Sequence, residues 1–164
     1  MKENLREELL TIIEKNSRID LKELAVLVGV TEIDVVNALE EMKAEGIICG
    51  YHTLINWEKT SIEKVTALIE VRVTPQRGQG FDRIAERIYK YPEVRSVYLI
   101  SGGYDLMVIL EGKSLREVSS FVSDKLSTLD TVLSTATHFI LKKYKDHGTI
   151  LNDKEDDERE MIMP

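Results

Sequence analysis

Along residues 65–144 the spacing of apolar side chains switches repeatedly between every second position and helical spacing. Residues 65–73 alternate, which predicts a half-buried strand, and residues 81–91 carry apolar side chains at helical spacing before Pro92. The same criteria predict, in order, strands over 94–100 and 106–110, a helix capped by Ser114, and a last strand over 131–144. The order β-α-β-β-α-β predicts a ferredoxin-like sandwich, in which two helices cover one face of an antiparallel sheet.

The first third of the chain shows helical spacing instead. It predicts three helices: over residues 3–16, from Asp20 to Gly29, and over 32–45 after the capping residue Thr31. A turn of about three residues that contains a glycine separates the last two helices, as in a helix-turn-helix. We therefore expect an α+β fold, with an N-terminal three-helix winged helix-turn-helix and a C-terminal βαββαβ ferredoxin-like sandwich.

The segment between these two parts is β-branched and aromatic. Residues 47–55 have no helical period, which predicts a strand or wing, with Cys49 buried on it. The polar residues 59–61 mark the domain boundary. We expect a DNA-binding helix-turn-helix domain over 1–58, a sandwich domain over 62–151, and an acidic, disordered tail over 152–164.

Charge and composition limit the partners of the chain. The net charge is −7, and residues 1–56 hold 6 basic and 11 acidic groups, which is unfavourable for contact with DNA phosphates. The single cysteine excludes an internal disulfide and a cysteine-rich zinc site. No apolar run approaches the roughly 18 residues of a membrane span, and the polar start lacks the apolar stretch of a signal peptide. We expect a cytoplasmic protein with no membrane partner, metal or cofactor.

Three segments carry a resemblance to a known family. Residues 16–25 (Asn-Ser-Arg-Ile-Asp-Leu-Lys-Glu-Leu-Ala) resemble the entry into the second helix of Lrp/AsnC regulators. Residues 45–51 resemble the strand that links their two domains, and residues 101–105 (Ser-Gly-Gly-Tyr-Asp) resemble their effector loop. The resemblance covers roughly residues 5–147. It implies a transcriptional regulator that binds double-stranded DNA, responds to a small effector, usually an amino acid, and forms homodimers that assemble into tetramers or octamers.

In this family, the helix over residues 32–45 would read the DNA. Helical phase predicts an inward face with Val35, Val36, Leu39 and Met42, and an outward face with Ile33, Asn37, Ala38, Glu40 and Glu41. Asn37 can pair with adenine and Ile33 can contact a thymine methyl group, whereas the glutamates would repel phosphates. The candidate DNA-contacting residues are Lys2, Lys15, Arg18, Lys22, Thr31, Ile33, Asn37 and Lys43. A protein of the same fold with weak or lost DNA binding is the alternative.

The candidate effector site combines two parts of the sandwich: the loop Ser101, Gly102, Gly103, Tyr104 and Asp105, and the strand residues Thr135, Thr137 and His138 of a neighbouring chain. Glycine N–H groups can approach a ligand carboxylate, and Asp105 can bind its ammonium group. On this interpretation Asp105→Ala abolishes the response to the effector and leaves the fold intact. The competing interpretation is that Gly102 and Gly103 only form a tight hairpin with positive φ.

Two further inferences concern assembly and catalysis. A sheet with one helix-covered face needs cover on the other, which predicts at least a dimer through residues 62–147.

A related group with this architecture decarboxylates sirohaem, a reaction that needs cationic and acid–base side chains. Residues 98–105 contain no His or Arg, so we expect no catalytic residues. His52 and His147 lack the spacing of metal ligands, and Trp57 is expected to pack or to cover a domain junction.

Overall fold

The computed structural model describes residues 2–74 and 80–151, with side chains from residue 4 onward. The chain divides into two compact units, Met1–Thr53 and Leu54–Pro164. The predicted tail over 152–164 and most of the predicted turn at 74–80 lie outside the described residues. Within the described ranges, no helix is long and apolar enough to cross a membrane.

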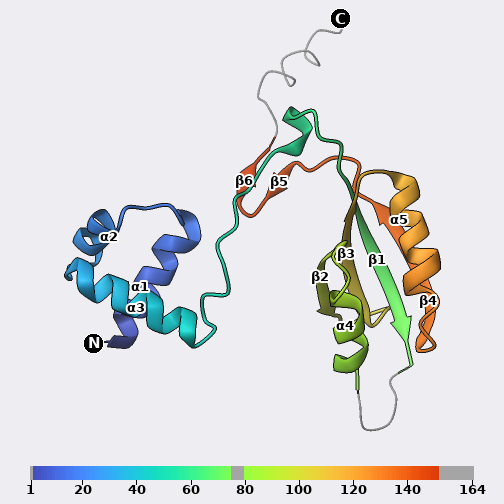
Figure 1. The fold of residues 1–164 in the computed structure, drawn as a ribbon, viewed down its shortest axis with the longest axis horizontal. Helices are drawn as coiled ribbons and strands as arrows, with labels where there is room; N and C mark the ends of the chain where they lie inside the picture. Colours follow the sequence, from blue (N-terminus) through green and yellow to red (C-terminus); the bar gives the residue numbers. More distant parts are fainter. Residues whose placement is uncertain (1, 75–79, 152–164) are drawn as a thin grey trace, which may run out of the picture. The chain divides into compact units, whose positions relative to one another are not determined.

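The first unit contains three helices whose ends are set by capping residues. They are α1 (Lys2–Lys15), α2 (Leu21–Val28) and α3 (Glu32–Ala44) (Figure 1). Asp20 accepts hydrogen bonds from the backbone N–H groups of Lys22 and Glu23, at 2.9 and 3.4 Å, and so begins α2. Gly29 ends α2 with φ of 71°, a conformation that side chains with a Cβ rarely adopt. The predicted helix-turn-helix is confirmed.

Thr31 begins α3 through a reciprocal capping arrangement. Its hydroxyl oxygen accepts a hydrogen bond from the backbone N–H of Asp34 at 3.2 Å, and its own N–H donates to the Asp34 carboxylate at 3.2 Å. The Thr31 hydroxyl also donates to that carboxylate at 2.6 Å. This network fixes the direction in which α3 leaves the turn.

The prediction of a strand over residues 47–55 is wrong for the single chain. After Gly46, the backbone N–H groups of Ile47 and Ile48 both bond to the carbonyl of Met42, and no strand follows before Val65. Cys49 is exposed, not buried as predicted. Residue composition gives a segment β propensity, but a strand also needs a partner for its N–H and C=O groups, and the described part of this chain supplies none.

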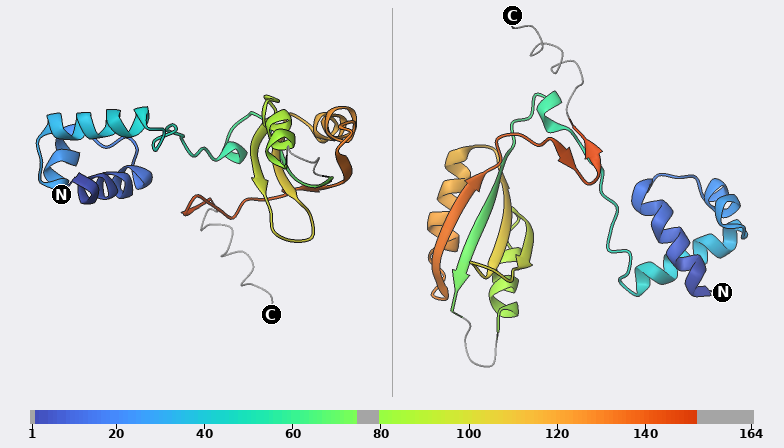
Figure 2. Two further views of the ribbon diagram at one scale, coloured as in Figure 1. Left: turned by 90° about the horizontal axis from the view of Figure 1, so that it is seen from below. Right: turned by 180° about the vertical axis from the view of Figure 1, so that it is seen from behind.

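The second unit contains the predicted β-α-β-β-α-β order. Its strands are β1 (Val65–Val73), β2 (Val94–Leu99), β3 (Leu106–Gly112) and β4 (Val132–Phe139), and its helices are α4 (Asp82–Tyr89) and α5 (Leu115–Phe121). A turn of π-helix, η2 (Val122–Leu126), continues α5. The sheet order is β2-β3-β1-β4 with antiparallel neighbours, so the ferredoxin-like arrangement is confirmed. Seen from behind, the strands lie in front of α5, with β4 at the edge (Figure 2).

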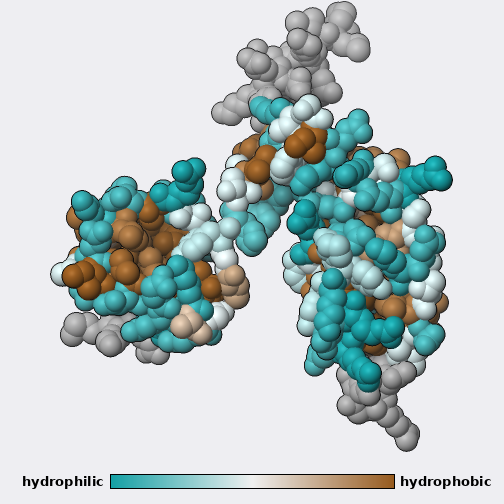
Figure 3. Space-filling view, viewed as in Figure 1, coloured by the Kyte–Doolittle hydropathy of each residue, from teal (hydrophilic) through white to brown (hydrophobic). Residues whose placement is uncertain are grey.

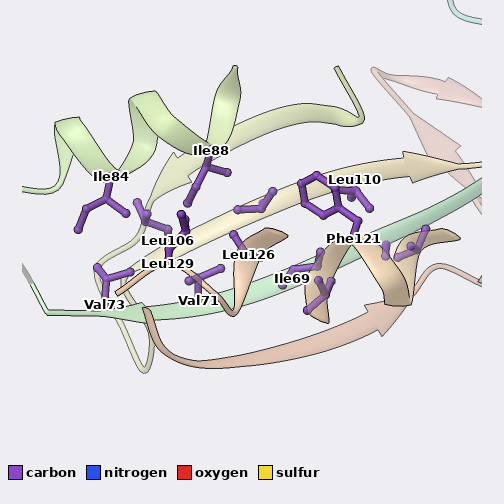
Figure 4. Packing of buried hydrophobic residues seen from close by; sticks show 14 residues of the cluster. Ile69, Val71, Val73, Ile84, Ile88, Leu106, Leu110, Phe121, Leu126 and Leu129 are labelled. Atoms are coloured by element: carbon purple, nitrogen blue, oxygen red, sulfur yellow. The ribbon is translucent and has the colours of Figure 1, made fainter. Parts of the chain in front are cut away.

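The core of the second unit lies between the sheet and its two helices. Ile69 and Val71 of β1 pack with Ile88 of α4 and Phe121 of α5, and all four are buried (Figure 4). Alternation along β1 places Leu68, Glu70 and Arg72 on the other face, which we call the open face. No helix of the described residues covers the open face.

The last predicted strand, over 131–144, is too long. β4 ends at Phe139, which pairs with Ala67 near the start of β1, and only the N–H of Ile140 still reaches the carbonyl of Thr66. The ladder ends because its partner strand begins there. A hairpin follows, made of β5 (Lys145–Asp146) and β6 (Thr149–Ile150), whose turn is His147-Gly148 with φ of 44° and 80°. Two consecutive positive φ values are typical of the type I′ hairpin turn.

The capping network of α3 gives a stability prediction. Thr31→Ala removes the hydroxyl that caps the helix, and we expect the free energy of unfolding at neutral pH to fall by about 1 kcal/mol. Thr11→Ala is the control, because that hydroxyl donates only to the carbonyl of Glu7 within α1. Denaturant unfolding followed by circular dichroism measures both.

The hydrogen bonds from Thr31 hold the pKa of Asp34 below its ordinary value. The stabilisation is therefore present above the ordinary pKa of Asp and lost as the pH falls through the lowered pKa. A Thr31→Ala effect that does not shrink on acidification would contradict this account.

Candidate DNA-binding surface and effector loop

The outward face of α3 is the candidate DNA-contacting surface. The buried face of α3 holds Val35, Ala38, Leu39 and Met42. The centre of the opposite face therefore carries Ile33, Asn37 and Glu40. Ile33 is 71% exposed, and Asn37 and Glu40 are exposed. The predicted outward positions of these three residues are confirmed.

Two of the predicted orientations on α3 are wrong. Val36 is 38% exposed although it was expected to face inward, and Ala38 is buried although it was expected to face outward. Residues in a helix are 100° apart, so Ala38 falls between Val35 and Met42 on the inner face, and Val36 falls on its flank. The apolar side chain of Val36 suggested burial, but its place on the helix decides otherwise. Figure 3 shows a hydrophobic patch on one face of the helical unit.

The acidic charge of α3 is partly neutralised in the folded chain. Lys43, the base on this helix, lies 2.9 Å from the Glu40 carboxylate, and this hydrogen bond raises the pKa of Lys43. Arg6 of α1 lies 2.6 Å from the Glu45 carboxylate. Glu41 lies on the flank of α3 that faces α1, where with Arg6 it lines a groove of about 640 Å³. Glu41 is exposed, as predicted, and Asn37 lines the same groove.

Arg6 was not among the residues singled out from the sequence. It neutralises an acidic residue 39 positions away, and no local pattern reveals such a pair. The hydrogen bond to Glu45 raises the pKa of Arg6, and the nearby charge of Glu41 raises it further. The helical unit is therefore less acidic along the α1–α3 side than its sequence suggests.

The remaining candidate DNA contacts fall into two groups. Lys15, Arg18 and Lys22 are exposed around the connection between α1 and α2. Thr31 is part of the capping network of α3, so in the free protein its hydroxyl proton is donated to Asp34 and not to a phosphate. The side chain of Lys2 lies outside the described residues.

The loop between β2 and β3 holds the candidate effector residues. The N–H of Ile100 donates to the carbonyl of Asp105 at 2.8 Å, and the N–H of Asp105 donates to the carbonyl of Val71 at 3.1 Å. Ser101, Gly102 and Gly103 are exposed between these two hydrogen bonds. Neither glycine has positive φ, so the interpretation of a tight hairpin that requires it is wrong. A Cβ on Gly103 would have no neighbour within 4 Å, which leaves the backbone there open to a ligand.

Asp105 has a structural role that the sequence did not reveal. Its Oδ2 accepts a hydrogen bond at 2.9 Å from the N–H of Val73, beside an irregularity in the pairing of β1 with β4. Val73 is 4% exposed, so no other group in the described chain replaces this acceptor readily. The carboxylate thereby ties the loop to the end of β1. This geometry does not support the prediction that Asp105→Ala leaves the fold intact.

The three candidate residues on β4 do not lie together. Thr135 and Thr137 pair with Val71 and Ile69, and so point to the helix-covered face. His138 points to the open face, where its Nε2 lies 3.3 Å from a carboxylate oxygen of Glu70. Neighbouring residues of a strand point to opposite faces, so one ligand on one face cannot contact His138 and Thr137 side chains together within a chain.

A helix-turn-helix and a ferredoxin-like sandwich in one chain define a class of transcriptional regulators that join a DNA-binding unit to a ligand-binding domain. The family model "Lrp/AsnC ligand binding domain" matches residues 66–150. The HTH-type transcriptional regulator YugG of Bacillus subtilis (strain 168) is 49% identical over 158 residues, which are 96% of this chain and 95% of that protein. The chain belongs to the Lrp/AsnC family of transcriptional regulators.

Solved structures show the same fold. The regulator NMB0573 from Neisseria meningitidis, in complex with L-Met, has a TM-score of 0.69 at 23% identity. The matched region covers 87% of this chain and 91% of the NMB0573 chain. AsnC of E. coli has a TM-score of 0.65 at 23% identity, with coverage of 85% and 92%. At these identities the likeness concerns the arrangement of the two domains' elements and not the residues of any site.

The two roles of Asp105 can be separated by substitution. Asp105→Ala leaves the buried N–H of Val73 without an acceptor, and we expect it to lower the free energy of unfolding by about 1 to 3 kcal/mol. Asp105→Asn keeps an oxygen in place and should be much closer to the parent protein. Thermal and denaturant unfolding measure the difference. Equal stability of the two variants would show that the hydrogen bond to Val73 contributes little.

Proposed function

We propose that this protein is a sequence-specific DNA-binding regulator whose assembly or DNA affinity changes when an amino acid binds at the loop 101–105. The observation that carries the proposal is the exposed outward face of α3, oriented by the Gly29 turn and the Thr31 cap, in a chain that also holds the family's ligand-binding domain. The structures of NMB0573 and of the regulatory protein Rv3291c, both with L-methionine, support an amino-acid effector.

The charges on α3 predict how DNA is bound. Asn37 offers an amide that can pair with adenine, and Ile33 offers an apolar contact for a thymine methyl group. Phosphate contacts depend on few bases, chiefly Lys15, Arg18 and Lys22, because Lys43 is paired with Glu40. We therefore infer modest affinity per domain, a steep dependence on salt, and reliance on several domains bound together.

Glu40 is the residue through which DNA affinity is most easily changed. Glu40→Gln removes a negative charge from the outward face and releases Lys43, so we expect tighter DNA binding, by about tenfold or less at moderate salt, and a steeper salt dependence. Glu41→Gln removes the same charge on the flank towards α1 and should have a smaller effect. Gel-shift titration on the DNA upstream of its own gene, over a salt series, measures both.

The same titration tests the alternative function, a sensor of this fold with weak or lost DNA binding. The acidic balance of residues 1–56 favours that alternative. If neither the parent nor Glu40→Gln shifts specific DNA in preference to random DNA, the alternative holds. If Glu41→Gln has the larger effect, the assigned orientation of α3 towards DNA is wrong.

The effector is expected to bind with its carboxylate at the exposed backbone of 101–103 and its ammonium group at Asp105. One carboxylate can accept several hydrogen bonds, so the bond from Val73 leaves Asp105 able to bind a cation. A thermal-shift screen of the twenty amino acids should find a ligand that raises the midpoint of unfolding. Asp105→Asn should weaken that ligand by roughly ten- to a hundredfold, because a charge-assisted hydrogen bond is lost. Equal affinity of parent and variant by calorimetry would place the effector elsewhere.

Assembly is proposed to use the open face of the sheet. Leu68, Met107 and Ile109 are partly exposed there, and Tyr98 is 51% exposed, which leaves an apolar strip that a second copy can cover. Ile109→Glu should turn a dimer into a monomer in light scattering at micromolar concentration. Leu115→Glu places the same charge on α5, at a side chain that is also exposed, and should not. A parent protein that is monomeric at that concentration would contradict the proposal.

A further inference from the structure

Two adjoining grooves on the first unit form one continuous depression, which we call the acidic groove. The larger part, of about 640 Å³, is lined by α1, by the turn after α2 and by α3. The smaller part, of about 420 Å³, is lined by α1 and the end of α2. Asn4, Glu8 and Val28 line both parts. Among the described side chains proposed to contact DNA, only Asn37 lines the groove.

The acidic groove carries carboxylates on two helices. Glu7 and Glu8 belong to α1, whereas Asp34 and Glu41 belong to α3, and all four side chains are exposed. Arg6 is the single base among the described side chains that line the groove, and it already forms an ion pair with a further glutamate at the end of α3. Negative charge is therefore in excess on both sides of the groove.

Hydrogen bonds inside the unit do not neutralise these carboxylates. The amide of Asn4 donates to Glu8 at 3.0 Å, and the hydroxyl of Thr31 donates to Asp34 at 2.6 Å. Both donors are uncharged, so each carboxylate keeps its charge. A carboxylate has lone pairs for several donors, so Glu8 and Asp34 can each accept a further hydrogen bond from a cation.

Between its charged rims the groove is apolar. Leu5, Val28 and Val30 are half-buried along it. Leu27 lines its edge and is 60% exposed, and the neighbouring Val26 of α2 is 80% exposed. Exposed apolar side chains that gather in one place and are bordered by charges are typical of a surface that contacts another protein.

We propose that the acidic groove docks a basic amphipathic helix of another protein. The apolar face of that helix covers Leu27 and Val28, and its lysine or arginine side chains on the two borders of this face bind the carboxylates of α1 and α3. A DNA backbone does not fit the groove, because its phosphates would lie against carboxylates. A simple cation does not fit either, because it would leave Leu27 uncovered.

A synthetic peptide serves as the probe for this surface. The peptide has about 15 residues, the length at which an isolated helix becomes stable, with leucines on one helical face and lysines elsewhere. It should bind the full-length protein in a fluorescence anisotropy titration. A peptide of the same composition whose leucines do not share a face should bind at least about tenfold more weakly, as should a peptide with glutamate in place of every lysine. No binding of the first peptide, or equal binding of the scrambled one, overturns the proposal.

Variants locate the peptide on the protein. Glu8→Lys should weaken binding by about three- to tenfold at low salt, because it replaces an attraction with a repulsion. Glu23→Lys makes the same change at an exposed residue of α2 that does not line the groove, and should have little effect. Leu27→Asn should weaken binding, whereas Ile33→Asn, at another exposed apolar residue of this unit, should not. An equal loss with Glu23→Lys would show general attraction between charges and overturn the proposal.

The same variants decide between this occupant and two others. If Leu27→Asn reduces the size of the assembly in light scattering, a second copy covers the groove and the proposal fails. If Glu8→Gln strengthens DNA binding as much as Glu40→Gln, the groove faces a duplex and the proposal also fails. The peptide titration needs neither DNA nor effector, so its result is independent of whether the function proposed above holds.

Discussion

The second unit depends on strand β1, which pairs along both of its edges. β3 and β4 both hydrogen-bond to it, and its alternate residues Ala67, Ile69 and Val71 are fully buried against the helices. The other elements of the sandwich are held in place through this strand. β2 pairs with β3, which pairs with β1, and α4 and α5 pack against β1 in the core. The Asp105 carboxylate caps the irregular end of β1 at Val73, so the loop that carries the candidate effector residues is held by the same strand.

β1 also relates the loop 101–105 to the open face of the sheet. The loop is bonded to β1 at Val71 and Val73, and the open face beside it carries the apolar strip proposed for a second copy. On that proposal, a ligand at the loop lies at the end of the same strand that takes part in assembly.

In the helical unit, the arrangement of charge matters more than its sum. Residues 1–56 hold an excess of acidic groups, yet Glu45 is paired with Arg6 and Glu40 is paired with Lys43. These exposed pairs contribute little to stability. Their consequence is functional, because they reduce the negative potential that phosphates would meet and at the same time engage Lys43. On the proposed function, affinity for DNA comes from Asn37 and Ile33, from phosphate contacts of Lys15, Arg18 and Lys22, and from several domains acting together.

Sequence alone determined the architecture of this protein, because apolar spacing and capping residues are local signals. Asp20, Gly29 and Thr31 set the helix ends as predicted, and the alternation of residues 65–73 set the central strand. The resemblance to the family was also evident from three short segments of the sequence. Tertiary structure decided everything that needs a distant partner. The segment 47–55 has strand propensity and no partner strand, and β4 stops where β1 begins. Arg6 meets Glu45, Asp105 meets Val73, and Trp57 meets Lys64 only when the chain has folded. Such contacts depend on the positions of two segments at once, and the spacing of residues along one segment cannot specify them.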